Sequence, residues 1–319
     1  MYNPKDMFLI PNLKGIAMLG VLLVHTSIWS EYVRSLVELF AMPIFAFFAG
    51  YCIKKSPSFD FSYIRRIISI YLTANIFYFV ASLPLYFSEI NWLKIAEYML
   101  YPNVVPLWFL VSMVLWYLIY KIFSPISAQT FSLFLVLSVL AFTFRQSNDP
   151  VGIIYRTFRF FPFYLIGTML DSSKFYAIRE AKIKKLLLPL FVAVCAVSSC
   201  YMNFHVVDNV FASLVVLLLS LACVYSLLVI TPGSRVALLS KTGFNSLLIY
   251  VCGFFFQRVF NEFIVKYNVR ENFGYGVVVL ANIVVIFIVL LFLNRDFFIR
   301  TYNKFILKFE SIIFLNRGK

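Results

Sequence analysis

Apolar residues run through this chain in long stretches, and short polar segments separate them. About 20 mainly apolar residues are enough to cross a bilayer as a helix. Run length predicts about ten such spans. Their approximate limits are 10–29, 35–53, 65–87, 104–123, 127–145, 151–170, 185–203, 209–231, 244–264 and 273–294. The shorter, mixed stretch 91–100 is typical of a helix on the membrane surface. The pattern predicts an all-α polytopic membrane protein.

The composition favours a single membrane domain over residues 1–319. Hydrophobic residues make up 62% of the chain and charged residues only 13%. A soluble domain has roughly 25% charged residues. No polar segment is long enough to form a soluble core of its own.

The net charge of +14 is explained by membrane topology. If the N-terminus is cytoplasmic, most Lys and Arg residues fall in loops on that side. The loops on the other side hold only Arg34, Lys94, Arg145, Lys266 and Arg270. By the positive-inside rule, both termini are predicted to be cytoplasmic, with a basic tail from about residue 295. We expect contacts with membrane lipids and no nucleic-acid partner, because no solvated basic face is left over.

Motifs of soluble enzymes and metal sites are missing from the sequence. All five cysteines fall in apolar runs without paired spacing, which is typical of reduced packing residues. The chain has two histidines and no GxSxG, P-loop or HExxH pattern, so no metal centre is expected. No Asp lies deep in a predicted span, which disfavours a cation-coupled transporter.

The first predicted span, 10–29, carries two polar groups, Lys14 and His25. They lie eleven positions apart, which is about three helical turns, so both fall on one helix face roughly 16 Å apart. Ionisable groups inside a membrane are costly and mark functional sites. The alternative is a snorkelling lysine and a histidine bonded to a neighbouring helix. His25 is the only imidazole in a predicted span and is the candidate for proton transfer.

Glu38 lies about one turn into the second predicted span. A short loop joins the first two spans, so they are expected to be antiparallel neighbours with Glu38 and His25 at similar depth. A carboxylate bonded to an imidazole would fix its tautomer and raise its basicity. The alternative is a carboxylate at the end of a loop that faces water.

Two arginine pairs are further candidates. Arg65 and Arg66 open the third span, and with Lys14 they could form an anion site, because guanidinium suits phosphate; ordinary positive-inside flanking is the alternative. Arg156 and Arg159 lie three apart on one face of the sixth span, which holds no acidic residue. A buried arginine needs a partner or a wet cavity.

Several short motifs occur in a fixed order over residues 10–255. Lys14 precedes His25 with ten positions between them, and MPIFAFFAGY follows at 42–51. Next come Arg66, LWFL at 107–110, RFFPF at 159–163 with Gly167, and NSLLIY at 245–250. The ordered set resembles the membrane-bound acyltransferase family 3, whose members O-acylate cell-surface glycans. The chain departs from the family pattern at Pro11, Ala49, Tyr63 and Gly253, where Asp, Ser, Arg and His are common.

The resemblance implies an O-acyltransferase in the inner (plasma) membrane of a bacterium. It would move an acyl group, expected to be acetyl, from cytoplasmic acetyl-CoA to a surface polysaccharide or its lipid-linked precursor. Acetyl-CoA would be a substrate, with no permanently bound cofactor. Lys14, Arg65 and Arg66 are expected to bind the CoA phosphates. His25 would be the base or the transient acyl carrier, oriented by Glu38. Arg156, Arg159 and Trp108 would contact the acceptor or the oxyanion.

Two other functions remain open at this point. A transporter or flippase for lipid-linked sugars would use the arginines for a pyrophosphate and would need no histidine chemistry. A structural membrane protein with a decayed site would account for the departures from the family pattern.

Overall fold

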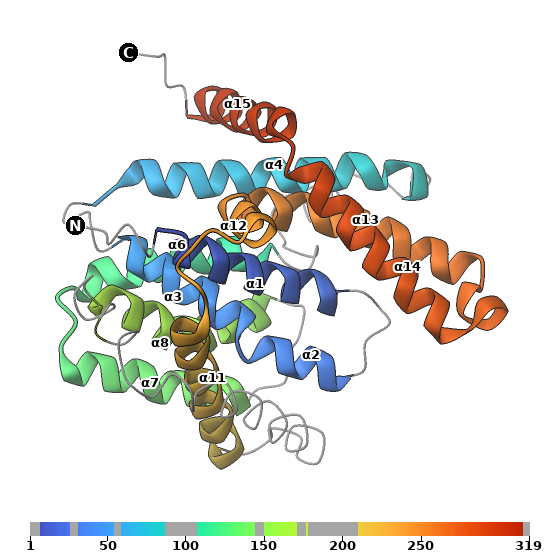
Figure 1. The fold of residues 1–319 in the computed structure, drawn as a ribbon. Coiled ribbons are helices and arrows are strands. Elements are labelled where there is room, and N and C mark those ends of the chain that lie inside the picture. The colour runs from blue at the N-terminus through green and yellow to red at the C-terminus, as the bar shows by residue number, and fades with distance from the viewer. Residues whose placement is uncertain are drawn as a thin grey trace.

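The computed structural model describes residues 7–25, 31–53, 59–86, 107–143, 150–170, 177 and 210–314. Helices dominate these residues, and no strand occurs among them. The helices are α1 (Leu9–Val24), α2 (Glu31–Glu38), α3 (Ala41–Ile53), α4 (Phe61–Tyr86), α6 (Trp108–Phe123), α7 (Ala128–Thr143), α8 (Pro150–Met169), α11 (Val210–Ile230), α12 (Ala237–Phe244), α13 (Ser246–Lys266), α14 (Val269–Leu293) and α15 (Asp296–Ile313). Figure 1 shows α1, α3 and α8 near the centre, α7 below them, α4 above them and α15 at the upper edge.

The all-α prediction is confirmed for the described residues, but the count of ten spans is not. Three segments are long and apolar enough to cross a membrane: Leu36–Ile53, Val210–Ile230 and Glu271–Leu293. A fourth would combine α12 with the first part of α13, which is bent by 90° relative to it. Three other apolar helices, α1, α6 and α7, have 16 residues each, which is short of a full crossing. The predicted segments 91–100 and 185–203 lie outside the described residues, and the structure does not test on which side the termini lie.

Helices α1 and α12 pack with their backbones in contact. A Cβ atom on Gly15 would overlap the carbonyl oxygen of Leu239. Asn12, fully buried in α1, donates hydrogen bonds of 2.8 Å to the carbonyl oxygens of Pro232 and Ser234. These bonds satisfy an amide that would otherwise be costly to bury. They fix the first turns of α1, and with them Lys14, relative to the segment before α12.

Helices α3 and α8 make a similar contact through two glycines. A Cβ on Gly50 would overlap the carbonyl oxygen of Tyr164, and a Cβ on Gly167 would overlap that of Phe47. Small residues allow this approach between apolar helices, where close packing replaces the hydrophobic effect as the source of stability. Both glycines belong to the motifs noted in the sequence, and their role here is to bring two backbones together.

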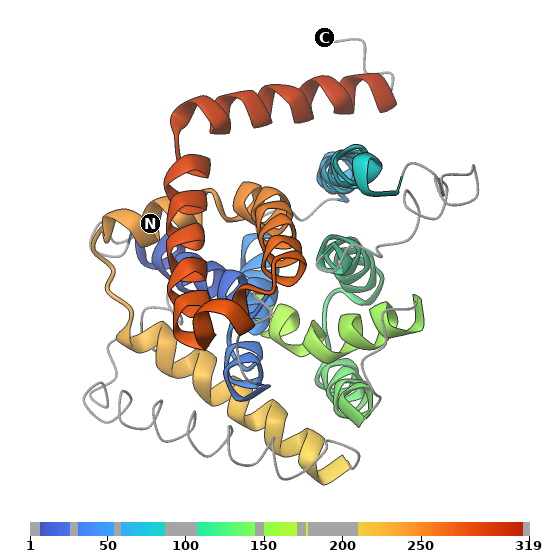
Figure 2. The same ribbon diagram turned by 90° about the vertical axis from the view of Figure 1, so that its right-hand side faces the viewer.

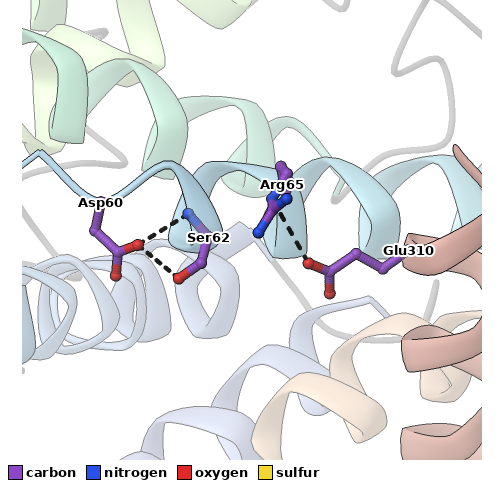
Figure 3. A network of polar contacts seen from close by, with 4 residues as sticks. All are labelled: Asp60, Ser62, Arg65 and Glu310. Carbon is purple, nitrogen blue, oxygen red and sulfur yellow. Dashed lines mark hydrogen bonds and ion pairs between the residues drawn. The ribbon is translucent and has the colours of Figure 1, made fainter. Parts of the chain in front are cut away.

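Helix α4 begins at a side-chain cap. The Asp60 carboxylate accepts hydrogen bonds from the backbone N–H of Ser62 at 2.8 Å and from its hydroxyl at 2.5 Å (Figure 3). Such caps satisfy the first free N–H groups of a helix. The bonds from Ser62 hold the pKa of the Asp60 carboxyl below its usual value. The Asp60 backbone N–H donates to the Tyr117 hydroxyl, which ties the start of α4 to α6.

Candidate functional site

A cavity of about 270 Å³ lies between α1, α3, α4, α6 and α13. Its walls are mainly aliphatic and aromatic. Of the described residues that line it, only Lys14 carries a full charge and none is acidic. The lining residues are Lys14, Met42, Phe45, Phe48, Ala49, Cys52, Ile53, Tyr63, Phe109, Met113, Ser246, Leu247 and Tyr250.

Four of the ordered sequence motifs meet at this cavity. Met42, Phe45, Ala49 and Cys52 recur every three or four residues along α3, so they lie on one helix face. The other walls come from the Lys14 motif, from LWFL and from NSLLIY. Motifs far apart in the chain therefore have a common structural purpose. The sequence presented them as an ordered set, and the structure shows that they line one space.

Lys14 lies beside two further polar groups of the cavity. The Cys52 thiol of α3 interacts electrostatically with Lys14 and with the Tyr63 hydroxyl of α4. The Tyr63 hydroxyl is buried, and no described residue hydrogen-bonds to it. Tyr63 stands where the family commonly has an arginine. The cavity thus pairs one ammonium group with a free hydroxyl on an otherwise apolar wall, which suits a ligand with an apolar body and an anionic end.

Arg65 and Arg66 do not appear among the described residues that line this cavity. The Arg65 Nε lies 3.9 Å from a carboxylate oxygen of Glu310 in α15, and its guanidinium lies over the ring of Phe314 (Figure 3). The side chain of Arg66 is exposed and interacts electrostatically with Tyr302, also in α15. The two arginines predicted to join Lys14 in binding phosphate therefore face the C-terminal helix.

His25 caps the C-terminal end of α1, at the opposite end from Lys14. Its imidazole meets the ring of Phe254 edge-on, with the ring centroids 4.2 Å apart. Its backbone carbonyl accepts a hydrogen bond of 3.2 Å from the Asn261 side chain. Both contacts come from α13, which also contributes to the cavity. The same helix therefore positions His25 and walls the space around Lys14.

The predicted pair of His25 and Glu38 is not what the described residues show. The charged groups that act on the imidazole are Arg34 and Arg156. The Glu38 carboxylate instead acts on the guanidinium of Arg159. Arg34 was missed as a site residue, although it lies four residues before Glu38 in α2. That spacing places both side chains on one helix face and was the available signal.

Aromatic rings hold the two arginines of α8. The Arg156 guanidinium lies 5.5 Å from the centroid of the Trp108 ring, and that of Arg159 lies 4.1 Å from the centroid of the Phe142 ring. Trp108 itself stacks on Phe160, with centroids 5.8 Å apart. A cation over an aromatic face is attracted by the ring quadrupole, most strongly when desolvated. The structure thus brings Trp108, Arg156 and Arg159 together around the Phe160 ring, and Arg156 acts electrostatically on His25. Their roles at the acceptor or oxyanion stay a prediction.

These observations define a membrane protein that is helical over the described residues. It has an apolar cavity at one end of its first helix and, at the other, a histidine on which two arginines act electrostatically. The family model described as an acyltransferase domain, that of acyltransferase family 3, matches residues 10–293, and the chain belongs to this family. The resemblance found in the motifs is thereby confirmed, and the protein is a membrane acyltransferase. No curated protein and no solved structure matches the chain. Helix α15 lies beyond the matched residues.

Proposed function

We propose that this protein transfers a short acyl group, acetyl in the simplest case, from acyl-CoA to a hydroxyl of a surface polysaccharide or its lipid-linked precursor. The observation that carries the proposal is the cavity of about 270 Å³ whose walls are built from the motifs of an acyltransferase family and whose one described cation is Lys14. The bacterial inner membrane, with acyl-CoA on its cytoplasmic side, is the setting that this reaction requires.

The cavity suits the reactive end of the donor. Its apolar walls match a pantetheine arm and a short acyl group, and Lys14 supplies a positive charge for a CoA phosphate. A cavity of this size lies slightly below the usual range for whole ligands. This favours a short acyl group over a long one.

The acceptor is activated at the other end of α1. A sugar hydroxyl is a poor nucleophile until a base removes its proton, and a positioned base contributes roughly 10²–10⁴-fold. In this mechanism His25 takes the proton while the hydroxyl oxygen bonds to the acyl carbon. The carbon–sulfur bond then breaks and CoA leaves, taking up a proton as the free thiol. In the proposal Arg156, which acts electrostatically on His25, and Arg159 stabilise the oxyanion or bind an acidic sugar.

The test is ester formation by membranes that contain the protein. Membranes are given radiolabelled acetyl-CoA and a glycan acceptor, and alkali-labile label on the glycan is counted. We expect transfer by the wild type and a loss of at least about a hundredfold in His25→Ala. The matched control is His205→Ala, which removes the chain's other histidine and should leave transfer unchanged. Ester formation by His25→Ala at the wild-type rate would refute the role of His25. A wild type that forms no ester with any acceptor would refute the reaction.

A further inference from the structure

A second cavity, of about 440 Å³, lies between α4, α13, α14 and α15. It shares no described lining residue with the first one. Helix α13 separates the two, because Ser246, Leu247 and Tyr250 face the first cavity while Leu248, Val251 and Cys252 face the second. Helix α15, which closes the second cavity, lies outside the residues matched by the family model. The acyltransferase assignment therefore does not account for this space.

The walls of the second cavity are apolar except for a few hydroxyl groups and one thiol. Two of these hydroxyls, on Thr73 of α4 and Tyr302 of α15, are buried without a hydrogen-bond partner among the described residues. A buried hydroxyl without a partner is costly, so it indicates a ligand atom that accepts a bond there. Arg66 interacts electrostatically with Tyr302 and is itself exposed. Along α4 the order is Arg66, then Thr73, then the apolar side chains of Ile76, Phe77 and Val80.

Helix α15 has the character of a helix at a membrane surface. It presents exposed cations at Arg300, Lys304 and Lys308 beside exposed apolar side chains, with Phe297 at 70% and Phe305 at 53% exposure. This combination is typical of interfacial helices that contact anionic lipids. In Figure 2, α4 is seen almost end-on and α15 runs across it.

The acidic groups of α15 are both paired, which leaves the cations in excess. Glu310 pairs with Arg65, and Asp296 lies 3.5 Å from the Lys241 ammonium. The pair of Arg65 and Glu310 also joins α15 to α4, as Figure 3 shows. An anionic headgroup at this edge would therefore meet positive charge and little repulsion.

We propose that this second cavity binds one acyl chain of an anionic phospholipid. The chain fills the apolar body, the Thr73 and Tyr302 hydroxyls donate to the ester linkage, and Arg66 contacts the phosphate. The order of groups along such a lipid, from apolar chain through ester carbonyl to phosphate, is the order found in the cavity. The site concerns the anchoring of the protein in its membrane and does not depend on the acyl-transfer reaction.

The test is lipid retention by the purified full-length protein, measured by native mass spectrometry. The protein is exchanged into detergent with equal amounts of phosphatidylglycerol and phosphatidylcholine that carry the same chains. We expect the wild type to retain one phosphatidylglycerol. Cys252→Trp fills the cavity and should lose it, whereas Leu218→Trp, at a position of α11 with 55% exposure, should keep it. A wild type without bound lipid, or equal retention by both variants, would overturn the proposal.

Two milder variants test the polar contacts without threatening the fold. Tyr302→Phe removes only an unpartnered hydroxyl, and its phosphatidylglycerol retention should fall roughly fivefold, as for one lost hydrogen bond. Arg66→Gln should abolish the preference over phosphatidylcholine, whereas Arg235→Gln, at another exposed arginine, should not. No change in either Tyr302→Phe or Arg66→Gln would refute the assigned contacts. Displacement of the phospholipid by palmitoyl-CoA would identify a donor site and overturn the lipid assignment.

Discussion

Replacing Lys14 by Gln should weaken donor binding more than any other single change at the cavity. Lys14 is the only described cation among the lining residues. A charge-assisted hydrogen bond contributes about 1.5–3 kcal/mol. At about 1.4 kcal/mol per factor of ten, the KM for acetyl-CoA should rise roughly 10- to 150-fold if it reports binding. The kcat should change little, because Lys14 and His25 lie roughly 16 Å apart along α1.

The assay is initial-rate acetyl transfer in membranes with acetyl-CoA varied at saturating acceptor. Arg66→Gln is the informative comparison, because that side chain is exposed and faces α15. A screened surface charge contributes up to about 1 kcal/mol, so its KM should rise by no more than about fivefold. Acetyl-pantetheine, which lacks the nucleotide phosphates, should be used equally well by wild type and Lys14→Gln. An unchanged KM for acetyl-CoA in Lys14→Gln, or a larger rise in Arg66→Gln, would refute the assignment of the donor to this cavity.

Two further predictions concern the packing around the site. Glu38→Gln removes a negative charge that acts on the Arg159 guanidinium, and it should lower kcat with a smaller effect on either KM. Initial-rate kinetics measure both constants, and a silent variant would show that the carboxylate is not needed. Gly50→Ala forces a methyl group onto the Tyr164 carbonyl oxygen, so it should lower the stability of the protein by about 1–3 kcal/mol, seen as a lower Tm. Gly276 has open space around it, so Gly276→Ala should leave the Tm unchanged. Equal Tm values for the two variants would contradict the close contact.

The helical class and the family could be predicted from the sequence, because both rest on local patterns. Run length predicted the helices, and the ordered set of short motifs predicted the family. The partners of charged side chains could not be predicted, since they depend on how helices meet. Glu38 was expected beside His25, but its carboxylate acts electrostatically on Arg159 instead. Arg65 was expected to bind phosphate, but it pairs with Glu310, which lies 245 positions further along the chain.

The number of spans stays a prediction, because the residues that the structure describes support three or four by length and composition. The length of an apolar run does not distinguish a helix that crosses the membrane from a shorter helix that is buried by its neighbours. Trp116 in α6 is fully buried, and its indole N–H donates to the Thr157 carbonyl oxygen of α8 at 2.7 Å. Such a helix is apolar because it packs against protein. The sequence alone does not distinguish it from a helix that is apolar because it faces lipid.

The glycine contacts between α3 and α8 have a consequence for how variation among relatives should be interpreted. No side chain fits at Gly50 or Gly167 without moving a backbone. Selection will therefore hold both positions constant in any relative that keeps this helix pair, including relatives that have lost activity. Ala49 and Tyr63 differ from these glycines, because their side chains line the donor cavity. A constant residue at either position would indicate a requirement of the substrate and not of helix packing. When sequences of this family are compared, constant glycines trace the scaffold, and the positions that change together along the cavity wall trace the substrate.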